Sequence, residues 1–414
     1  MIPFSPPRID QKIIDEVTAV LKSGWITTGP RTKLFEKKIT GYTGCKSTLC
    51  LNSATAGLEI MLRWFGVKEG DEVIVPAYTY SATANVVIHC GAKPVFVDVN
   101  DDFNISVENI EKAITANTKV IMPVDFGGFP CDYDSINKLV SSDGIRKKFV
   151  AASPEQSKLG RILVLSDAAH SLGAWYKGKR TGCLTDVSVF SFHAVKNLTT
   201  AEGGAVSLNL PAPFDNTEVY NKLCVTTLHG QNKDALAKMQ KGNWRYDIVE
   251  AGYKCNMADI LAAIGLVELE RYDSDTLIKR KKICDAYRNT LEKYSWAILP
   301  EEVTGTPLTQ SSYHLFPLRI KGVNESQRDE IIQKIFDKDV SVNVHFIPVP
   351  MMSFYKALGY DISDYPKTYN IYSSEISLPV FYDLSDEQVT QVLDAVVEAV
   401  EKVTSQKLQV SSHK

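Results

Sequence analysis

The residue with the clearest chemical potential is Lys196, in a segment (191–205) that follows an apolar run and leads into a turn rich in hydroxyl side chains and glycine. A primary amine in such a place can form a Schiff base with a carbonyl cofactor, of which the aldehyde of pyridoxal phosphate is the leading case. Most lysines are solvated surface charges, because Lys rarely leaves water. The chemical interpretation therefore depends on other residues that complete a site around Lys196.

An acid and an imidazole follow another predicted strand. The apolar run 162–166 leads directly into Asp167, and His170 comes three residues later. A carboxylate in this position could pair with a protonated pyridine nitrogen, and His170 could donate to the ring oxygen of the same cofactor. The alternatives are that Asp167 caps the next helix and that His170 is a satisfied packing residue.

Two further features could bind the phosphate and the ring. The small residues of 52–57 open a predicted helix, whose free N–H groups suit an anion, and the Ser191 hydroxyl could add to the same cradle. Tyr80, in a turn after a predicted strand, could stack on a flat ring. The alternatives are a plain helix cap by Ser53 or Thr55 and core packing of the tyrosine.

The elements that must position these residues alternate along the chain from about residue 50 to 210. The predicted strands are 72–76, 94–99, 119–124, 162–166, 187–191 and 205–208. The predicted helices are 55–65, 82–89, 106–114 and 133–140. This alternation predicts an α/β fold with a mostly parallel sheet between helices. Ligands of such sheets bind outside the carboxyl ends of the strands, where the candidate residues fall.

The remaining segments predict a second, smaller unit. Helices are expected at 8–22, 31–41, 257–269 and 277–291, and 141–160 is interpreted as a polar surface excursion. After residue 270, strands at 313–320 and 341–346 accompany helices at 325–337 and 386–403. We therefore expect a large domain over 1–270, including the N-terminal helix, and a small C-terminal α+β domain over 271–414.

Composition excludes several classes of function. The 414 residues carry a net charge of −3, so no basic footprint for nucleic acid exists. The start has no signal-peptide pattern and no apolar run reaches membrane-spanning length, so we expect a cytoplasmic protein without a membrane partner. The eight cysteines are scattered without paired spacing, which argues for reduced thiols and against a metal site.

Taken together, the motifs resemble the DegT/DnrJ/EryC1/StrS family of pyridoxal-phosphate-dependent nucleotide-sugar aminotransferases, which have the type I aminotransferase fold. Within the family, the motifs resemble those of members that make UDP-4-amino-4-deoxy-L-arabinose from the 4-keto precursor. The motifs that carry the resemblance are 23–30 (SGWITTGP), 53–57 (SATAG), 70–76 (GDEVIVP), 167–170 (DAAH), 190–197 (FSFHAVKN), 201–204 (AEGG), 252–257 (GYKCNM), 344–346 (VHF) and 377–379 (SLP).

The resemblance implies a role for each candidate residue. Lys196 would hold pyridoxal 5'-phosphate and move the proton between substrate and cofactor, with Asp167 on the pyridine nitrogen and His170 on the ring oxygen. The remaining cofactor-binding residues would be Ala54, Thr55, Tyr80 and Ser191.

The resemblance also implies a homodimer with shared active sites. Asn256 would complete the phosphate site of the second subunit, while Thr28 and His345 would line the sugar-nucleotide cleft. Two residues depart from the family pattern: Cys255 stands where a tyrosine is usual, and Tyr80 stands where the most similar members have tryptophan. These departures leave the particular sugar open.

The expected reaction moves an amino group from L-glutamate, which becomes 2-oxoglutarate, to a nucleotide-linked 4-ketosugar, with UDP as the leading nucleotide. The product would serve amino-sugar and surface polysaccharide biosynthesis. Alternatives are amination at C3 and sugar dehydration with the same cofactor, although the dehydrating branch of the family has a histidine in place of Lys196. A non-catalytic regulatory relative is the remaining alternative.

Overall fold

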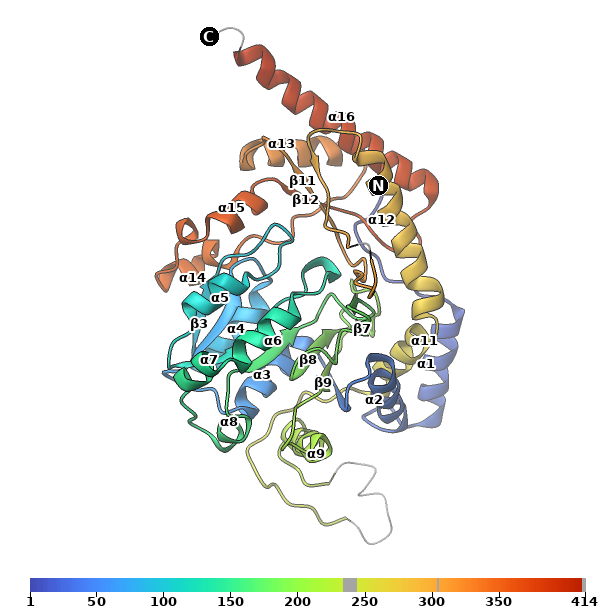
Figure 1. Ribbon diagram of the computed structural model, residues 1–414. Coiled ribbons are helices and arrows are strands. Elements are labelled where there is room, and N and C mark those ends of the chain that lie inside the picture. The colour runs from blue at the N-terminus through green and yellow to red at the C-terminus, as the bar shows by residue number, and fades with distance from the viewer. Residues whose placement is uncertain (234–243, 304, 412–414) are drawn as a thin grey trace.

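A computed structural model describes residues 1–233, 244–303 and 305–411, and its centre is a seven-stranded sheet (Figure 1). The strand order is β1-β9-β8-β5-β4-β2-β3. Only β9 runs antiparallel to its neighbours within this sheet. The strands are β1 (Ser47–Leu51), β2 (Glu72–Pro76), β3 (Lys93–Val97), β4 (Thr118–Ile121), β5 (Leu163–Asp167), β8 (Val187–Ser191) and β9 (Gly204–Leu208). The predicted α/β fold with a mostly parallel sheet is confirmed.

Helices pack on both faces of this sheet because its strands are apolar on both sides. In β2, Val73 and Val75 join one buried cluster, whereas Ile74 between them joins the cluster on the opposite face. Such alternation without a polar face is what a sheet buried on both sides requires. The helices are α3 (Ala54–Trp64), α4 (Ser81–His89), α5 (Val107–Ala113) and α6 (Tyr133–Ser141).

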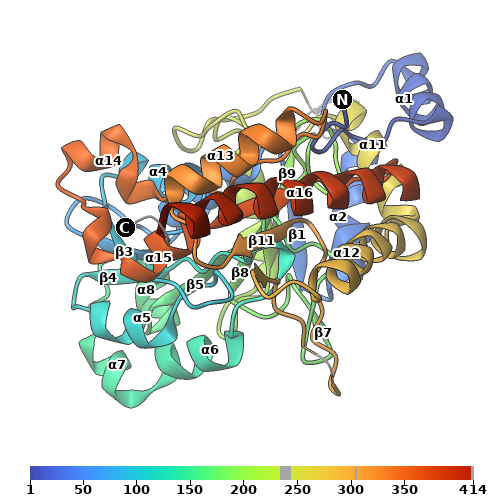
Figure 2. The same cartoon turned by 90° about the horizontal axis from the view of Figure 1, so that it is seen from above.

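A second, antiparallel sheet lies under the C-terminal helices. Its strands are β10 (Ala297–Ile298), β11 (Phe316–Ile320) and β12 (Glu375–Leu378), and its helices are α12 (Leu277–Leu291), α13 (Glu325–Phe336) and α16 (Asp386–Ser411). Figure 2 shows α13 and α16 side by side across β11. Ile2 packs in the same core and bridges to Val340. The division into two domains at residue 270 stays a prediction.

The other elements connect or flank the two sheets. They are α1 (Gln11–Ser23), α2 (Pro30–Thr43), α7 (Asp143–Lys148), α8 (Pro154–Leu159), α9 (Asn216–Thr226), α11 (Asp259–Glu270), α14 (Ser353–Ala357), α15 (Pro366–Tyr372), the hairpin of β6 (Trp175–Tyr176) and β7 (Lys179–Arg180), and the short turns Phe126–Gly128, Tyr272–Thr276, Val349–Met351 and Ile362–Asp364. None of the helices in the described part of the chain is both long and apolar enough to span a bilayer.

Several local predictions differ from the structure, and β1, β12, α14 and α15 were not predicted at all. The strand expected at 341–346 is wrong: this segment meets β12 at a single backbone bridge, Asn343 to Ser377, and the amides of Val344 and His345 both donate to side chains. The polar stretch 141–160 holds α7 and α8, and α9 was not predicted because its sequence is polar. In each case the tertiary contacts outweighed the local pattern.

Candidate active site

A cleft of about 500 Å³ opens at the carboxyl ends of β5 and β8 and is covered by loops that precede β11 and α14. Eight residues singled out from the sequence line it: Ala54, Thr55, Tyr80, Asp167, His170, Ser191, Lys196 and His345. These residues come from five separate parts of the chain, so the fold brings the separate motifs to one place. Two predicted residues, Thr28 and Asn256, do not line this cleft.

Lys196 lies partly buried in the cleft, five residues beyond the end of β8. Burial lowers the pKa of its amine to about 8, and the negative charge of Asp167 opposes this shift. An amine with this pKa is neutral in a substantial fraction of molecules at neutral pH, and only the neutral form is a nucleophile or a base. Lys196 is therefore suited to covalent chemistry in a way that a solvated lysine is not.

Asp167 is the last residue of β5, and its carboxyl group is buried at the bottom of the cleft. It accepts hydrogen bonds from the Thr83 hydroxyl (2.8 Å) and the Ala169 amide (3.2 Å). Burial raises the pKa of Asp167, while these two bonds and the charge of Lys196 act against the rise. A buried carboxylate of this kind binds a protonated ring nitrogen strongly, because the cation removes the cost of burial.

The tautomer of His170 follows from its hydrogen bonds. The Gly127 amide donates to His170 Nδ1 (3.2 Å), so Nδ1 carries no proton. Burial and the positive charge of Lys196 hold the pKa of His170 well below its usual range, so the ring is neutral. The proton must then be on Nε2. His170 can therefore donate, as a hydrogen bond to a cofactor oxygen requires.

The start of α3 forms the opposite wall of the cleft. Ser53 caps the helix by accepting from the Ala56 amide (3.1 Å), which leaves the first-turn amides of Ala54 and Thr55 without a partner inside the helix. At Gly204, a Cβ atom would lie 2.4 Å from the Ala54 nitrogen, so only glycine lets β9 pass this close. Such a helix start with hydroxyls beside it can hold a phosphate.

Tyr80 stands at the mouth of the cleft. Its side chain is exposed, and its ring centroid lies 5.7 Å from that of Phe346. The ring is therefore placed where it can cover a flat ligand without first leaving a packed core.

Thr28 and Asn256 lie together, outside the cleft of their own chain. Asn256 Nδ2 donates to the Thr28 hydroxyl, which in turn donates to the Met257 carbonyl oxygen. Neither residue lines the cleft that contains Lys196 of the same subunit.

The sequence analysis missed His314, which lines the cleft, and its hydrogen-bond partner Asn197, which does not. Asn197 Nδ2 donates to the Ser312 carbonyl (2.7 Å), so its Oδ1 accepts from Nδ1 of His314 (2.9 Å), whose ring packs 4.3 Å from that of His170. His314 precedes β11, and nothing in its local sequence separates it from an ordinary buried histidine. Only Asn197, next to Lys196, carried a usable positional signal.

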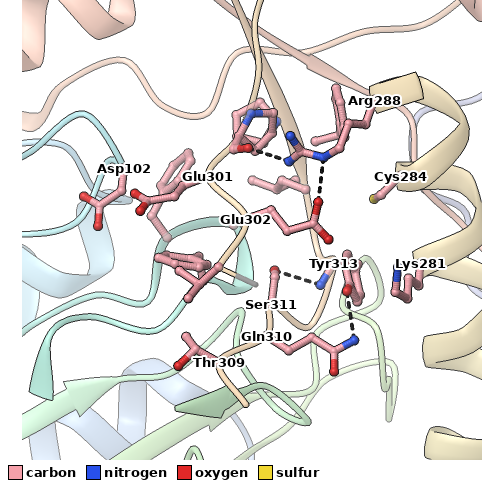
Figure 3. Close-up of a pocket in the computed structure, with 18 of the residues that line it drawn as sticks. Asp102, Lys281, Cys284, Arg288, Glu301, Glu302, Thr309, Gln310, Ser311 and Tyr313 are labelled. Carbon is pink, nitrogen blue, oxygen red and sulfur yellow. Dashed lines mark hydrogen bonds and ion pairs between the residues drawn. The ribbon is translucent and has the colours of Figure 1, made fainter. Parts of the chain in front are cut away.

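A second cavity of about 280 Å³ lies between α12 and the segment before β11 (Figure 3). Arg288 pairs with Glu302 (3.1 Å) and donates to the Pro300 carbonyl (2.5 Å), so its charge is already satisfied. Lys196 does not line this second cavity. Leu315 lines both the second cavity and the cleft. The reactive groups thus belong to the larger cleft.

The donor set of the cleft fits pyridoxal phosphate and not a metal. Within the described residues, no group of three or more His, Cys, Asp or Glu side chains could hold a metal ion. A lysine with a lowered pKa, a buried carboxylate, a donating histidine and a helix start match the aldehyde, ring nitrogen, ring oxygen and phosphate of this cofactor in turn.

Solved structures with the same fold support this match. Spr1654 from Streptococcus pneumoniae, assigned as a sugar aminotransferase, is 46% identical in its PMP form, with a TM-score of 0.93 over 97% of this chain and 100% of that chain. Its PLP form is also similar, with a TM-score of 0.91. PseC from Helicobacter pylori, an aminotransferase involved in pseudoaminic acid biosynthesis, is 28% identical, with a TM-score of 0.84 over 97% of this chain and 99% of that chain.

The fold and the cleft thus define a pyridoxal-phosphate-dependent aminotransferase. The model of the DegT/DnrJ/EryC1/StrS aminotransferase family matches residues 7–397. The spore coat polysaccharide biosynthesis protein SpsC of Bacillus subtilis is 36% identical over 407 residues, which cover 96% of this chain and 97% of SpsC. The chain belongs to the DegT/DnrJ/EryC1/StrS aminotransferase family.

Proposed function

We propose that this aminotransferase moves the amino group of L-glutamate to a nucleotide-linked 4-ketosugar, with a UDP-linked sugar as the expected acceptor. The product is an amino sugar for a surface polysaccharide, made in the cytoplasm. The similarity to SpsC and PseC, whose names refer to polysaccharide and pseudoaminic acid biosynthesis, supports a sugar acceptor. The observation that carries the proposal is the buried amine of Lys196 in one cleft with Asp167.

The proposed residue roles follow the geometry of the cleft. When bound, pyridoxal phosphate supplies an aldehyde that takes up the amino group and a ring that withdraws electrons. Asp167 binds the ring nitrogen and keeps it protonated, since Thr83 and the Ala169 amide fix the direction of its carboxyl group. His170 donates from Nε2 to the ring oxygen, because Gly127 occupies Nδ1.

The remaining roles concern the proton and the phosphate. The Lys196 amine would hold the cofactor and, when free, would act as the base and acid that moves a proton from or to the substrate carbon. The amides of Ala54 and Thr55 and the Ser191 hydroxyl bind the phosphate, and Tyr80 covers the ring. His345 faces the sugar substrate.

We also propose a homodimer in which each subunit completes the site of the other with Thr28 and Asn256. Their position outside the cleft of their own chain supports this arrangement. If Lys196→Ala and Asn256→Asp proteins are each inactive, unfolding and refolding them together should restore roughly a quarter of the activity, because half of the dimers then have one intact site. No recovery would contradict shared sites.

The acceptor is tested by following the visible absorption of the bound cofactor. L-glutamate should remove this absorption, and a UDP-4-ketosugar should restore it with formation of an amino sugar. If L-glutamate leaves the absorption unchanged, the proposal that it is the amino donor is wrong. Recovery with only a 3-ketosugar would move the reaction to C3, and release of ammonia with a deoxysugar would indicate dehydration.

A further inference from the structure

A chain of hydrogen bonds leads from a buried acid to the substrate side of the cleft. Ser377 Oγ lies 2.5 Å from Glu375 Oε1 and 2.9 Å from His345 Nδ1. The His345 amide donates to the other carboxyl oxygen of Glu375 (3.1 Å). Glu375 and Ser377 are both completely buried in β12, whereas His345 lines the cleft.

The ring of His345 is neutral and has one nitrogen left for a ligand. Burial and the positive charge of Lys196 lower the pKa of His345 to about 3, so a single proton is shared between its two nitrogens at neutral pH. Nδ1 faces Ser377, which leaves Nε2 at the opposite edge of the ring for the cleft. Nε2 therefore donates if the Ser377 hydroxyl donates to Nδ1, and it accepts if the Ser377 hydroxyl accepts from Nδ1.

The charge state of Glu375 determines whether the Ser377 hydroxyl donates a hydrogen bond to His345 Nδ1 or accepts one from it. If the carboxyl group is protonated, Oε1 donates to Ser377, the Ser377 hydroxyl donates to Nδ1, and the proton of His345 must be on Nε2. If the carboxyl group is ionised, Ser377 donates to Oε1 instead and accepts from Nδ1, so Nε2 is left as an acceptor. The two charge states of Glu375 thus give His345 opposite hydrogen-bonding roles in the cleft.

The surroundings of Glu375 favour its protonated form. Arg328, on α13, directs its guanidinium to the main-chain oxygens of Tyr372 and Glu375 and to Asp329, and not to the Glu375 carboxyl group. Arg319, opposite Glu375 on β11, pairs with Asp101 (3.4 Å).

The remaining neighbours of Glu375 do not reverse the preference for its protonated form. Tyr78, after β2, also interacts electrostatically with Glu375, and its hydroxyl is neutral because burial raises its pKa far above the usual value. Burial raises the pKa of Glu375 to about 8, against which the bonds from Ser377 and His345 and the charge of Arg328 act.

We propose that Glu375 is a positioning residue which, through the hydroxyl of Ser377, keeps the proton of His345 on Nε2, so that His345 donates a hydrogen bond to a substrate oxygen that can only accept. Carbonyl, carboxylate and phosphate oxygens are of this kind, whereas a sugar hydroxyl can adapt to either role. This inference rests on the proposed function, in which the acceptor-only oxygen belongs to the ketosugar or its diphosphate, or to the carboxylate of the amino donor.

The two half-reactions distinguish these sources. In the holoenzyme, the KM for L-glutamate and the KM for a UDP-4-ketosugar are measured separately from pH 6.5 to 9.5 by the visible absorption of the cofactor. The KM of the half-reaction that uses His345 should rise about tenfold as Glu375 ionises, the cost of one lost hydrogen bond. If neither KM changes through this pH range, the proposal is wrong.

Glu375→Gln separates this effect from other titrations. The His345 amide needs an acceptor, so the glutamine oxygen faces it and the NH₂ group faces Ser377, which reproduces the protonated acid at every pH. The rise in KM should disappear in this variant. Glu36→Gln is the matched control, because Glu36 is also buried and accepts from a main-chain amide, that of Cys50, but its partners Cys50, Lys33 and Tyr220 do not line the cleft. A Glu375→Gln protein that keeps the rise would overturn the proposal.

The proton itself can be observed without any sugar. In the ¹⁵N-histidine-labelled holoenzyme, the signals of His345, assigned by their loss in His345→Gln, should show the proton on Nε2 at pH 7 and a shift towards Nδ1 above pH 8. In Glu375→Gln they should stay unchanged. A proton on Nδ1 at pH 7 would overturn the proposal. If no ketosugar restores the absorption, the proposed acceptor fails, while these spectra still decide the role of Glu375.

Discussion

The cleft has two halves that are built in different ways. The sheet half consists of Asp167, Ser191 and Lys196 with the start of α3, and its side chains follow directly from the ends of parallel strands. The loop half consists of His314 and His345, which lie in irregular segments and are held by side-chain hydrogen bonds with Asn197 and Ser377, respectively.

The difference between the halves suggests a division of labour. Strand ends fix the groups that need exact placement for bond making, such as an amine and the carboxylate that faces the cofactor ring. Loops held by side-chain hydrogen bonds instead set ring orientation and proton position, which small shifts can alter. We therefore expect substitutions in the sheet half to reduce the chemical steps and substitutions in the loop half to change binding and pH dependence.

The largest effect is expected for Lys196→Ala. Loss of the amine removes both the attachment of the cofactor and the proton transfer, so turnover should fall by about 10⁴-fold or more. The phosphate contacts remain, so the variant should still bind the cofactor. The rate of absorbance loss with L-glutamate measures the effect, and Lys293→Ala, an exposed lysine after α12, is the control. Normal turnover in Lys196→Ala would remove the distinction between the halves.

Asp167→Asn should have the next largest effect. The amide keeps the shape of the side chain but loses the charge that holds a protonated ring nitrogen, so we expect a fall in kcat of about 100-fold or more. Thr83→Val removes the 2.8 Å hydrogen bond that orients Asp167, together with the 2.9 Å hydrogen bond between the hydroxyls of Thr83 and Thr79, and should cost a smaller part of that rate. A Thr83→Val protein as slow as Asp167→Asn would mean that orientation, rather than charge, is the main contribution of this acid.

The same difference explains what could be predicted from sequence. Asp167 was found because a strand that ends in an acidic residue is visible in the order of residues, and Lys196 because it follows a predicted strand closely and precedes a turn rich in hydroxyl side chains and glycine. His314 and Glu375 were not found, because their roles depend on partners that are far away in the chain, such as Asn197 and His345. The segment 341–346 was predicted as a strand from its apolar pattern, but it makes only one bridge to β12.

The reactivity of Lys196 should depend on pH in a defined direction. Because its pKa is lowered to about 8, the neutral amine increases from about one molecule in ten at pH 7 to about nine in ten at pH 9. The rate at which cofactor-free protein captures pyridoxal phosphate should therefore rise about tenfold over this range and then level off. Stopped-flow absorption measures this rate. A rate that keeps rising to pH 10.5 would indicate that the pKa of Lys196 is that of a solvated lysine and that the sheet half is less buried.

The smallest effect concerns Gly128, at the point where the two halves meet. Its φ of +95° disfavours other residues, and a Cβ there would lie 2.1 Å from Ser312 Oγ and 3.0 Å from the His170 carbonyl oxygen. Ser312 donates to that oxygen (2.5 Å), and the adjacent Gly127 amide donates to the His170 ring, so an added methyl group displaces the contacts that position His170.

Gly128→Ala should therefore lower the free energy of unfolding by about 1–3 kcal/mol, seen as a lower Tm, and raise the KM for glutamate a few-fold while kcat changes less. Gly144→Ala is the matched control, because Gly144 lies in α7 with open space around it, where alanine favours the helix. If Gly128→Ala lowers kcat and leaves KM unchanged, the junction acts on the chemical step, and the loop half does more than orient the site. Equal Tm values for the two variants would show that the segment around Gly128 can accommodate a methyl group, and that other contacts hold the two halves together.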